Sequence, residues 1–197
     1  IGYNVLGELT LAFSEESGGA SILTSGLANN RSLEKLDLKR AFVESEGPET
    51  FLAVCKSLSG NATLRYLNIS DNGVRLDGVY ATALKLDTMS LETLELNCNA
   101  VTSCGIAALA QSLHGACTLE KLCLRGCGLD DTGLLKLGEA LTSTVSLEVL
   151  DVRKNNFTHN GACQFFELLP QMKGLKAVYG LVVVGNGVPP TEAVGMA

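Results

Sequence analysis

The hydrophobic positions of this 197-residue chain follow one pattern that recurs along its length. Each copy has leucine or another apolar residue at its first, fourth and sixth positions, and this spacing predicts a short strand with one buried face. Clear copies begin at Leu33, Leu64, Leu91, Leu119 and Leu147, and weaker ones begin at Leu6 and Leu175. Successive starts lie 27 to 31 residues apart, which is too regular for chance.

A second set of positions completes each copy. Three residues after the last apolar strand position stand Asn72, Asn99, Cys127 and Asn155, and two residues further stand Val74, Val101, Leu129 and Phe157. Fourteen residues after the first leucine stand Gly47, Gly78, Gly105, Gly133 and Gly161. Beyond the glycine the period changes to that of an amphipathic helix, as at Ile106, Leu109, Ala110 and Leu113. Each copy is therefore a strand, a turn, a helix and a return loop.

A single strand–helix unit cannot cover its own apolar faces, so neighbouring units must stack to form a continuous core. Stacking gives every strand the same direction, with the leucines between the sheet and the helices. The Asn or Cys position then lies in the dry turn after the strand. An Asn amide there can bond the backbone groups of adjacent turns, and a Cys can replace it as a small, weakly bonding residue.

The pattern LxxLxLxx(N/C)xL, followed by glycine and a helix, resembles a leucine-rich repeat of the ribonuclease-inhibitor-like subclass. That subclass includes the repeats of NOD-like receptors and of the Ran GTPase-activating protein. The resemblance implies an α/β solenoid shaped like a horseshoe, with a parallel sheet on the concave face and helices on the convex face. It covers about residues 1–185, as about seven repeats of about 28 residues.

The repeats predict a single domain over residues 1–185 and a C-terminal tail over 186–197, because Gly185 to Pro190 is too rich in Gly and Pro to continue a helix. The first copy is degraded, with Ser14 at the Asn position. It is either a divergent first repeat or the point at which the chain was cut from upstream sequence. We expect a fragment of a longer chain. The three extra residues of the copy at Leu33 are expected in the loop from Ser57 to Thr63.

Residues that alternate with the inward leucines point to the concave face. Those predicted to bind a partner are Lys35, Asp37, Lys39, Tyr66, Asn68, Glu95, Asn97, Lys121, Cys123, Arg125, Asp151, Arg153 and Tyr179. With the residues of the following turns, this face has seven cations and four anions, in a chain whose net charge is −6. The excess predicts a partner with an acidic surface. The alternative is a solvated strip of mixed charge.

Composition excludes several other functions. A net charge of −6 argues against nucleic acid as the partner, and no apolar run approaches the roughly 18 residues of a membrane helix. The seven cysteines include no C-x-x-C pair, so neither a metal site nor a cofactor is expected. Cys98 and Cys123 are predicted to be exposed thiols. Free cysteines favour a cytoplasmic protein, although four Asn-x-Ser/Thr triplets keep a secreted one open.

These observations predict a non-enzymatic protein-interaction module that binds its partner on the concave face. It would be a sensor or scaffold segment of a larger intracellular protein, and it would pack against further repeats or domains of that chain. The alternative is a GTPase-activating protein of the Ran-activating type, in which Arg40, Arg125 or Arg153 approaches the nucleotide.

Overall fold

The structure is a computed structural model of the whole chain. It describes residues 7–10, 19–41, 47–59, 61–73, 75–77, 86, 89–113 and 118–181. For residues 19–23, 47–51 and 76 it describes the backbone alone.

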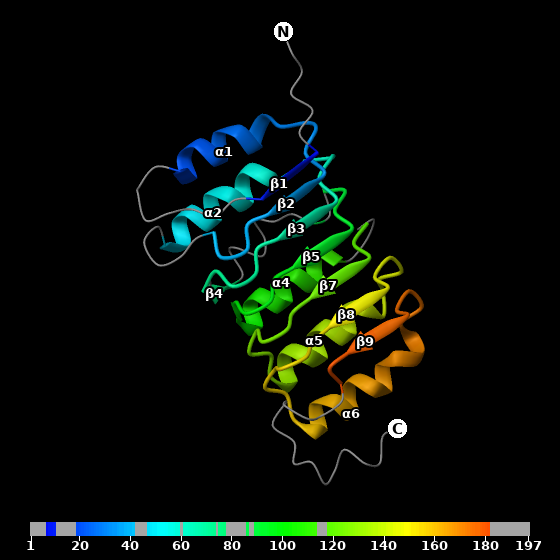
Figure 1. Cartoon of the computed structure of the whole chain (residues 1–197). Coiled ribbons are helices and arrows are strands. Elements are labelled where there is room, and N and C mark those ends of the chain that lie inside the picture. Colours follow the sequence, from blue (N-terminus) through cyan, green and yellow to red (C-terminus); the bar gives the residue numbers. More distant parts are fainter. Residues whose placement is uncertain are drawn as a thin grey trace.

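Seven short strands form one parallel sheet in the order β1-β2-β3-β5-β7-β8-β9 (Figure 1). They are β1 (Glu8–Thr10), β2 (Lys35–Asp37), β3 (Tyr66–Asn68), β5 (Thr93–Glu95), β7 (Lys121–Cys123), β8 (Val149–Asp151) and β9 (Ala177–Tyr179). Each strand pairs with the same three positions of the next repeat. The repeat register predicted from the leucines is therefore confirmed.

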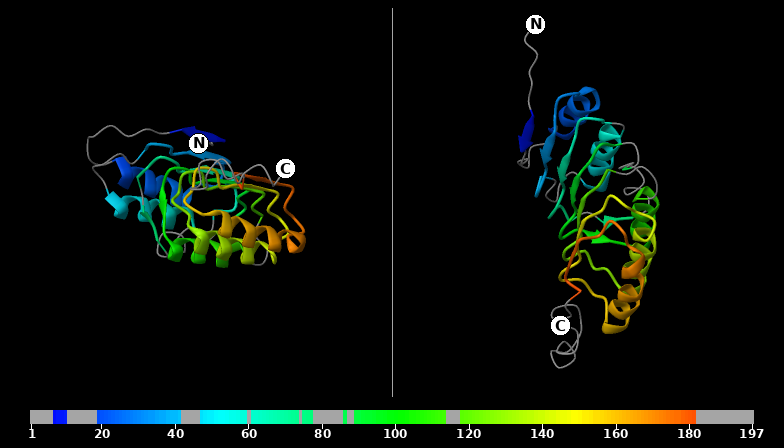
Figure 2. Two further views of the ribbon diagram at one scale, coloured as in Figure 1. Left: turned by 90° about the horizontal axis from the view of Figure 1, so that it is seen from below. Right: turned by 90° about the vertical axis from the view of Figure 1, so that its right-hand side faces the viewer.

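The helices form a second layer on one face of this sheet (Figures 1 and 2). They are α1 (Gly19–Asn29), α2 (Gly47–Leu58), α4 (Ser103–Leu113), α5 (Asp131–Leu141) and α6 (His159–Leu168), which leads into the 3-10 helix η2 (Leu169–Gln171). Each strand of the main sheet runs in the same direction and lies beside the strand of the preceding repeat. The molecule is therefore an α/β solenoid with leucines between its two layers and with one face of the sheet open. None of the described helices has the length and apolar content needed to cross a bilayer.

The core is built from the three apolar strand positions. The middle one is fully buried in five consecutive repeats, at Leu36, Leu67, Leu94, Leu122 and Leu150. Its neighbours along the strand point away from the helices because side chains alternate across a sheet. Helix residues such as Ile106, Leu109 and Leu134 close the core from the other side, also without exposed area.

A ladder of polar groups occupies the turns behind the strands, as expected for the Asn positions. The Asn99 amide donates to the carbonyls of Ile69 and Leu96, at 2.8 and 3.1 Å, and the Asn99 side-chain oxygen accepts from the Asn72 N–H. Cys127 continues the ladder by donating from Sγ to the Leu96 carbonyl at 3.3 Å. The buried turns of successive repeats are thus hydrogen-bonded to one another.

Asn155 holds the ladder at the C-terminal end. Its amide donates to the carbonyls of Leu124 and Val152, at 2.9 and 2.7 Å, while its oxygen accepts from the N–H groups of Cys127 and Leu129. In the repeat of β2 the equivalent residue is Ala41, which is buried but has no side-chain donor.

Three of the described helices begin earlier than the sequence pattern indicates, whereas α2 begins at its repeat glycine, Gly47. In α4, α5 and α6 the repeat glycine is the third helical residue, not the boundary. The glycine is needed for close packing: a Cβ on Gly161 would lie 2.3 Å from Oδ1 of Asp131 in the preceding repeat. That carboxylate accepts hydrogen bonds from the N–H and hydroxyl of Thr158, so it occupies the space beside the next helix.

The three extra residues of the repeat at Leu33 are not in the loop from Ser57 to Thr63, so that prediction is wrong. Leu58 stands six residues before Leu64, and Leu113 and Leu141 stand equally far before Leu119 and Leu147. The return loop has the same length as in the other repeats. It is held by hydrogen bonds in which the Asn61 side-chain oxygen accepts from the N–H groups of Thr63 and Leu64. The extra length lies between Ala41 and the end of α2.

A small second sheet was not predicted. It pairs β4 (Arg75–Leu76) with β6 (Ala100–Val101) in parallel, at the edge where the main strands end. The backbone register sets Leu76 beside Val101, whereas the sequence alignment had set Val74 there. Val74 and the helix expected after Gly78 lie outside the described residues, apart from Leu86 and the stretch that begins at Met89.

The two ends of the row differ from its middle. Leu9 of β1 and Val178 of β9 are only partly buried, although the equivalent leucines between them have no exposed area. The seventh strand predicted near Leu175 is present as β9. Ser14, the tail at 186–197 and the boundary near 185 lie outside the described residues.

Candidate interaction surface on the open face of the sheet

The open face of the sheet carries side chains in register across all seven strands. Neighbouring strands of a sheet lie about 4.8 Å apart, so equivalent side chains of successive repeats are adjacent. The first column is Glu8, Lys35, Tyr66, Thr93, Lys121, Val149 and Ala177, and the second is Thr10, Asp37, Asn68, Glu95, Cys123, Asp151 and Tyr179. No described element covers this face (Figure 2).

Charges at the N-terminal half of this face are matched locally. Lys35 forms an ion pair with Glu8 of the neighbouring strand and lies 5.4 Å from the centre of the Tyr66 ring. Lys39 and Arg40 both approach the Asp71 carboxylate, at 3.4 Å. These pairs are solvent-exposed, so they add little to folding stability, but they leave little net charge for a partner.

The centre of the face is a polar cluster around Tyr66. Burial raises the pKa of Tyr66 to about 12, with smaller contributions from the charges of Glu95 and Asp37. Lys121 lies 3.9 Å from the Glu95 carboxylate. The Tyr66 phenol therefore stays protonated at neutral pH and acts as a hydrogen-bonding group, not as an acid.

The C-terminal half is organised by Arg153. Its guanidinium donates two hydrogen bonds to Asp151, at 2.9 and 2.6 Å, and lies 5.8 Å from the centre of the Tyr179 ring. Burial acts to raise the pKa of Asp151, but the hydrogen bonds from Arg153 outweigh it and the pKa is lowered. Asp151 is therefore a buried anion that fixes Arg153 against an exposed tyrosine.

The turns that follow the strands share a left-handed residue. Arg40, Asp71, Cys98 and Lys154 have φ between 55° and 57°, and Gly126 occupies the same position with φ 66°. These residues lie in the turns, where the alternation of the strand has ended, so their side chains do not continue the two strand columns. The signal available in the sequence was Gly126, since glycine adopts this conformation without steric cost.

The predicted binding residues fall into three groups by exposure. Lys39, Arg153 and Tyr179 are exposed, and Lys35, Asp37, Tyr66, Glu95, Asn97, Lys121 and Arg125 are half-buried. Asn68, Cys123 and Asp151 were also expected to point to the concave face, but they are buried, with at most 6% of each residue exposed. Little of these three side chains is therefore available to a partner.

The two cysteines predicted to be exposed also differ in burial. Cys98 is exposed, as predicted, but Cys123 is buried and its pKa is raised to about 11, mainly by burial. The Cys98 thiol contacts the carboxylate of Asp71, and burial and this hydrogen bond also raise its pKa. Neither environment activates a thiolate.

Glutamates recur one residue after the first leucine of most repeats, at Glu34, Glu92, Glu120 and Glu148, whereas the repeats at Leu64 and Leu175 have Arg65 and Lys176 at this position. Each of these two basic residues forms an ion pair with a glutamate of the column. Arg65 lies 3.5 Å from Glu92, and Lys176 pairs with Glu148. Among the described residues, no three potential metal ligands converge.

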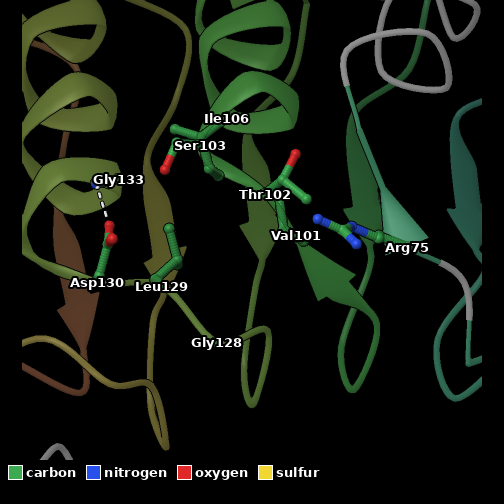
Figure 3. Close-up of a pocket in the computed structure, with 9 residues that line it drawn as sticks. All are labelled: Arg75, Val101, Thr102, Ser103, Ile106, Gly128, Leu129, Asp130 and Gly133. Atoms are coloured by element: carbon green, nitrogen blue, oxygen red, sulfur yellow. Dashed lines mark hydrogen bonds between the residues drawn. The ribbon is translucent and has the colours of Figure 1, made fainter.

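A pocket of about 290 Å³ lies at the starts of α4 and α5 (Figure 3). Arg75 points towards Thr102 on one side, and Asp130 lies on the other. Both helix starts are already capped: Asp130 accepts from the Gly133 N–H, and Thr102 from the Gly105 N–H. The open face, with its free side chains, is the better candidate site.

Comparison with known proteins agrees with the repeat geometry. Residues 60–81, 89–110 and 115–138 match the family model described as Leucine Rich repeat. Human Centrosomal protein of 78 kDa is 30% identical over 160 residues, which cover 68% of this chain and 23% of that protein. Mouse NACHT, LRR and PYD domains-containing protein 14 is 32% identical over 142 residues, covering 71% and 14%. Mouse Ribonuclease inhibitor is 28% identical over 206 residues, covering 85% and 44%.

The chain is a leucine-rich-repeat protein of the ribonuclease-inhibitor-like type. It spans about a fifth of the length of the centrosomal relatives that it matches, from human and mouse. The solved structure of Leiomodin-1 Actin-Binding Site 2 has the same fold, with a TM-score of 0.59, 15% sequence identity and coverage of 79% of this chain and 90% of that one. Leucine-rich-repeat proteins in general bind other proteins through such extended surfaces.

Proposed function

We propose that this leucine-rich-repeat array is a non-enzymatic protein-interaction module that binds a partner protein on the open, concave face of its sheet. The observation that carries the proposal is the pair of in-register side-chain columns on a sheet whose other face is dry. Because the core leucines beneath the columns have no exposed area, the surface is rigid and little entropy is lost when a large partner binds.

The proposed partner has an acidic surface. With Glu8 of β1 included, the face and its turns carry seven cations and five anions in a chain whose net charge is −6, so cations are concentrated here. Electrostatic complementarity of this kind mainly sets the association rate and the choice of partner.

We assign the module to a larger intracellular protein, as a sensor or scaffold segment that can pack against further repeats or domains. Residues 1–185 would form the domain and 186–197 its tail. The similarity to a protein named as centrosomal supports a scaffold, and the similarity to NACHT, LRR and PYD domains-containing proteins supports a sensor. The unpaired cysteines support a reducing compartment.

No observation in the described ranges favours the GTPase-activating alternative. Arg40 and Arg153 are held by Asp71 and Asp151. An arginine that completes a GTPase site has to be free to reach the nucleotide. Among the residues that the structure describes, Arg125 has no carboxylate within 4.0 Å, so it stays a candidate, but no observation there marks a nucleotide site beside it.

The test is quantitative affinity capture from a cell extract with three immobilised forms of the full chain. One is the natural chain, one carries Lys121→Ala and Arg125→Ala on the open face, and one carries Lys136→Ala and Glu139→Ala on the exposed side of α5. Each substituted residue is at least partly exposed, so all three forms should fold.

We expect specific partners to be depleted at least severalfold on the open-face variant and retained on the α5 variant. Partners retained equally by the natural chain and the open-face variant would contradict the proposal. So would depletion on the α5 variant alone, since it would move the binding surface to the helices.

A further inference from the structure

The cationic excess of the open face is not spread over the row of strands. On β1, β2, β3 and β5 and the described turns that follow them, three cations (Lys35, Lys39 and Arg40) face four anions (Glu8, Asp37, Asp71 and Glu95), so this half has a net charge of −1. On β7 and β8 and their turns, four cations (Lys121, Arg125, Arg153 and Lys154) face Asp151 alone. The C-terminal half therefore carries three net positive charges, and the cationic excess of the face lies entirely there.

The ion pairs sharpen this division. Within the described part of the chain, Lys35, Lys39 and Arg40 each have a carboxylate within 4.0 Å, whereas Arg125 and Lys154 have none. Arg125 is half-buried and Lys154 is exposed. Two cations on neighbouring turns are thus available to an incoming anion.

The same half also becomes apolar. The first column changes from charged or polar residues at Glu8 to Lys121 into Val149 and Ala177, both half-buried. The second column ends at Tyr179, which is 51% exposed and is one of two large hydrophobic side chains exposed to that degree among the described residues. Val149, Ala177 and Tyr179 therefore form an apolar strip on β8 and β9, beside the free cations.

Arg153 restricts the position of the Tyr179 side chain in this strip. The buried Asp151 holds its guanidinium by two hydrogen bonds, and the guanidinium in turn lies over the Tyr179 ring. Tyrosine and arginine that are already fixed lose little side-chain entropy on binding, which is the property of residues that dominate interfaces.

We infer that β7, β8 and β9 form a docking site for an extended acidic protein segment that carries an aromatic or large aliphatic side chain. The carboxylates would meet Arg125 and Lys154, and the apolar side chain would lie on Val149, Ala177 and Tyr179. This inference rests on the proposed function but narrows it, because β2 to β5 would contribute little to the affinity.

The experiment uses the full chain and a display library of random dodecapeptides as the probe. The two tightest selected peptides are then measured by fluorescence anisotropy against two double variants. Arg125→Glu with Lys154→Glu reverses the free cations, and Lys39→Glu with Arg40→Glu reverses two paired cations at the equivalent positions of the repeat of β2. Both pairs change the net charge equally, and thermal unfolding confirms that each variant is folded.

We expect the selected peptides to be rich in Asp and Glu around one aromatic or aliphatic residue. The Arg125/Lys154 variant should bind them at least about tenfold more weakly at low salt, and the Lys39/Arg40 variant within about twofold of the natural chain. Tyr179→Ser should also weaken binding about tenfold, and this loss should persist at high salt because it is not electrostatic.

Thiol protection locates the bound peptide independently. A Cβ on Gly126 would lie 3.6 Å from Sγ of Cys98, which puts this exposed thiol beside the Arg125 turn. A bound peptide should slow the alkylation of Cys98 by iodoacetamide severalfold. Cys104, which is exposed in the first turn of α4, should react at an unchanged rate.

Several results would overturn the inference. Neutral or basic selected peptides, no selected peptide, or tighter binding of a 12-nucleotide single-stranded DNA would contradict the proposed chemistry. Equal losses in both double variants would contradict the location but leave concave-face binding intact. Peptides that bind both variants and leave Cys98 unprotected would contradict the proposed function as well.

Discussion

At the scale of single residues, the polar positions of the repeat are as constrained as the leucines. Asn72, Asn99 and Asn155 are buried because each bonds the carbonyl groups of two successive turns. A buried carbonyl without a donor loses the hydrogen bonds it made to water, so the turn cannot simply be apolar. Cys127 satisfies one of these carbonyls with a weaker donor.

We expect Asn155→Ala to destabilise the fold by about 2–4 kcal/mol, because it leaves two carbonyls and two N–H groups without their partner. Cys127→Ala should cost less, about 1 kcal/mol, since only a weak thiol hydrogen bond is lost. Urea unfolding measures both. Equal losses for the two variants would contradict the ladder as the reason for the asparagine.

Asp151 gives a prediction that depends on pH. Its pKa is lowered in the folded chain, so its contribution to stability is complete above the pKa of the unfolded chain, about 4, and is lost as the pH falls through the folded value. Asp151→Asn should therefore lower the urea midpoint at pH 7, and this loss should shrink as the pH falls through the folded-state pKa of Asp151. A difference that stays constant as the pH is lowered would show that the carboxylate charge is not what stabilises the turn.

At the scale of elements, each helix is positioned by contacts with the repeat before it. Asp131, the first residue of α5, accepts two hydrogen bonds from Thr158 just before α6. Gly161 leaves room for that carboxylate. At Gly161 the repeat glycine is thus explained by packing between neighbouring helices, whereas the sequence pattern alone suggested a helix start.

Gly161→Ala is expected to destabilise the fold by about 1–3 kcal/mol, although alanine is the better helix former, because its Cβ would overlap Asp131. Gly7→Ala is the control, since a Cβ there has no atom within 4 Å. Thermal unfolding of both variants measures the difference. Stabilisation by Gly161→Ala would mean that Asp131 moves aside at no cost.

At the scale of the whole molecule, each repeat is stabilised by packing against the repeats beside it. Each repeat packs mainly on the next, and the leucines of the central strands are fully buried while Leu9 and Val178 at the ends are not. Such an array opens from its ends, because an end repeat has only one neighbour to lose.

Hydrogen exchange should follow this gradient. The N–H of Lys121, which donates to Glu92 at the centre of the sheet, should exchange at least tenfold more slowly than the N–H of Lys35, which donates to Gly7 of the first strand. Residue-resolved exchange by NMR measures both rates. Equal protection would indicate that the array unfolds as one cooperative unit.

The sequence alone determined the repeat architecture of this protein and the positions that face the two sides of its main sheet. The leucine spacing fixed the number and direction of the strands, and the Asn and Cys positions fixed the buried turns, because a repeated unit has one way to bury its apolar face against its copies. The same regularity let the concave residues be predicted by position. It could not find β4 and β6, or the extra length before the end of α2, since these depend on contacts outside the repeat pattern.

Only the tertiary structure decided which concave residues remain available. Strand alternation treats Asp37, Asn68, Cys123 and Asp151 alike, but the last three are buried whereas Asp37 is half-buried. It also treats all the cations alike, yet a carboxylate reaches Lys35 and Arg153 while Arg125 and Lys154 have none among the described residues. Burial and pairing depend on side chains 27 to 31 residues apart that stacking brings together, and a strand's own sequence does not contain them.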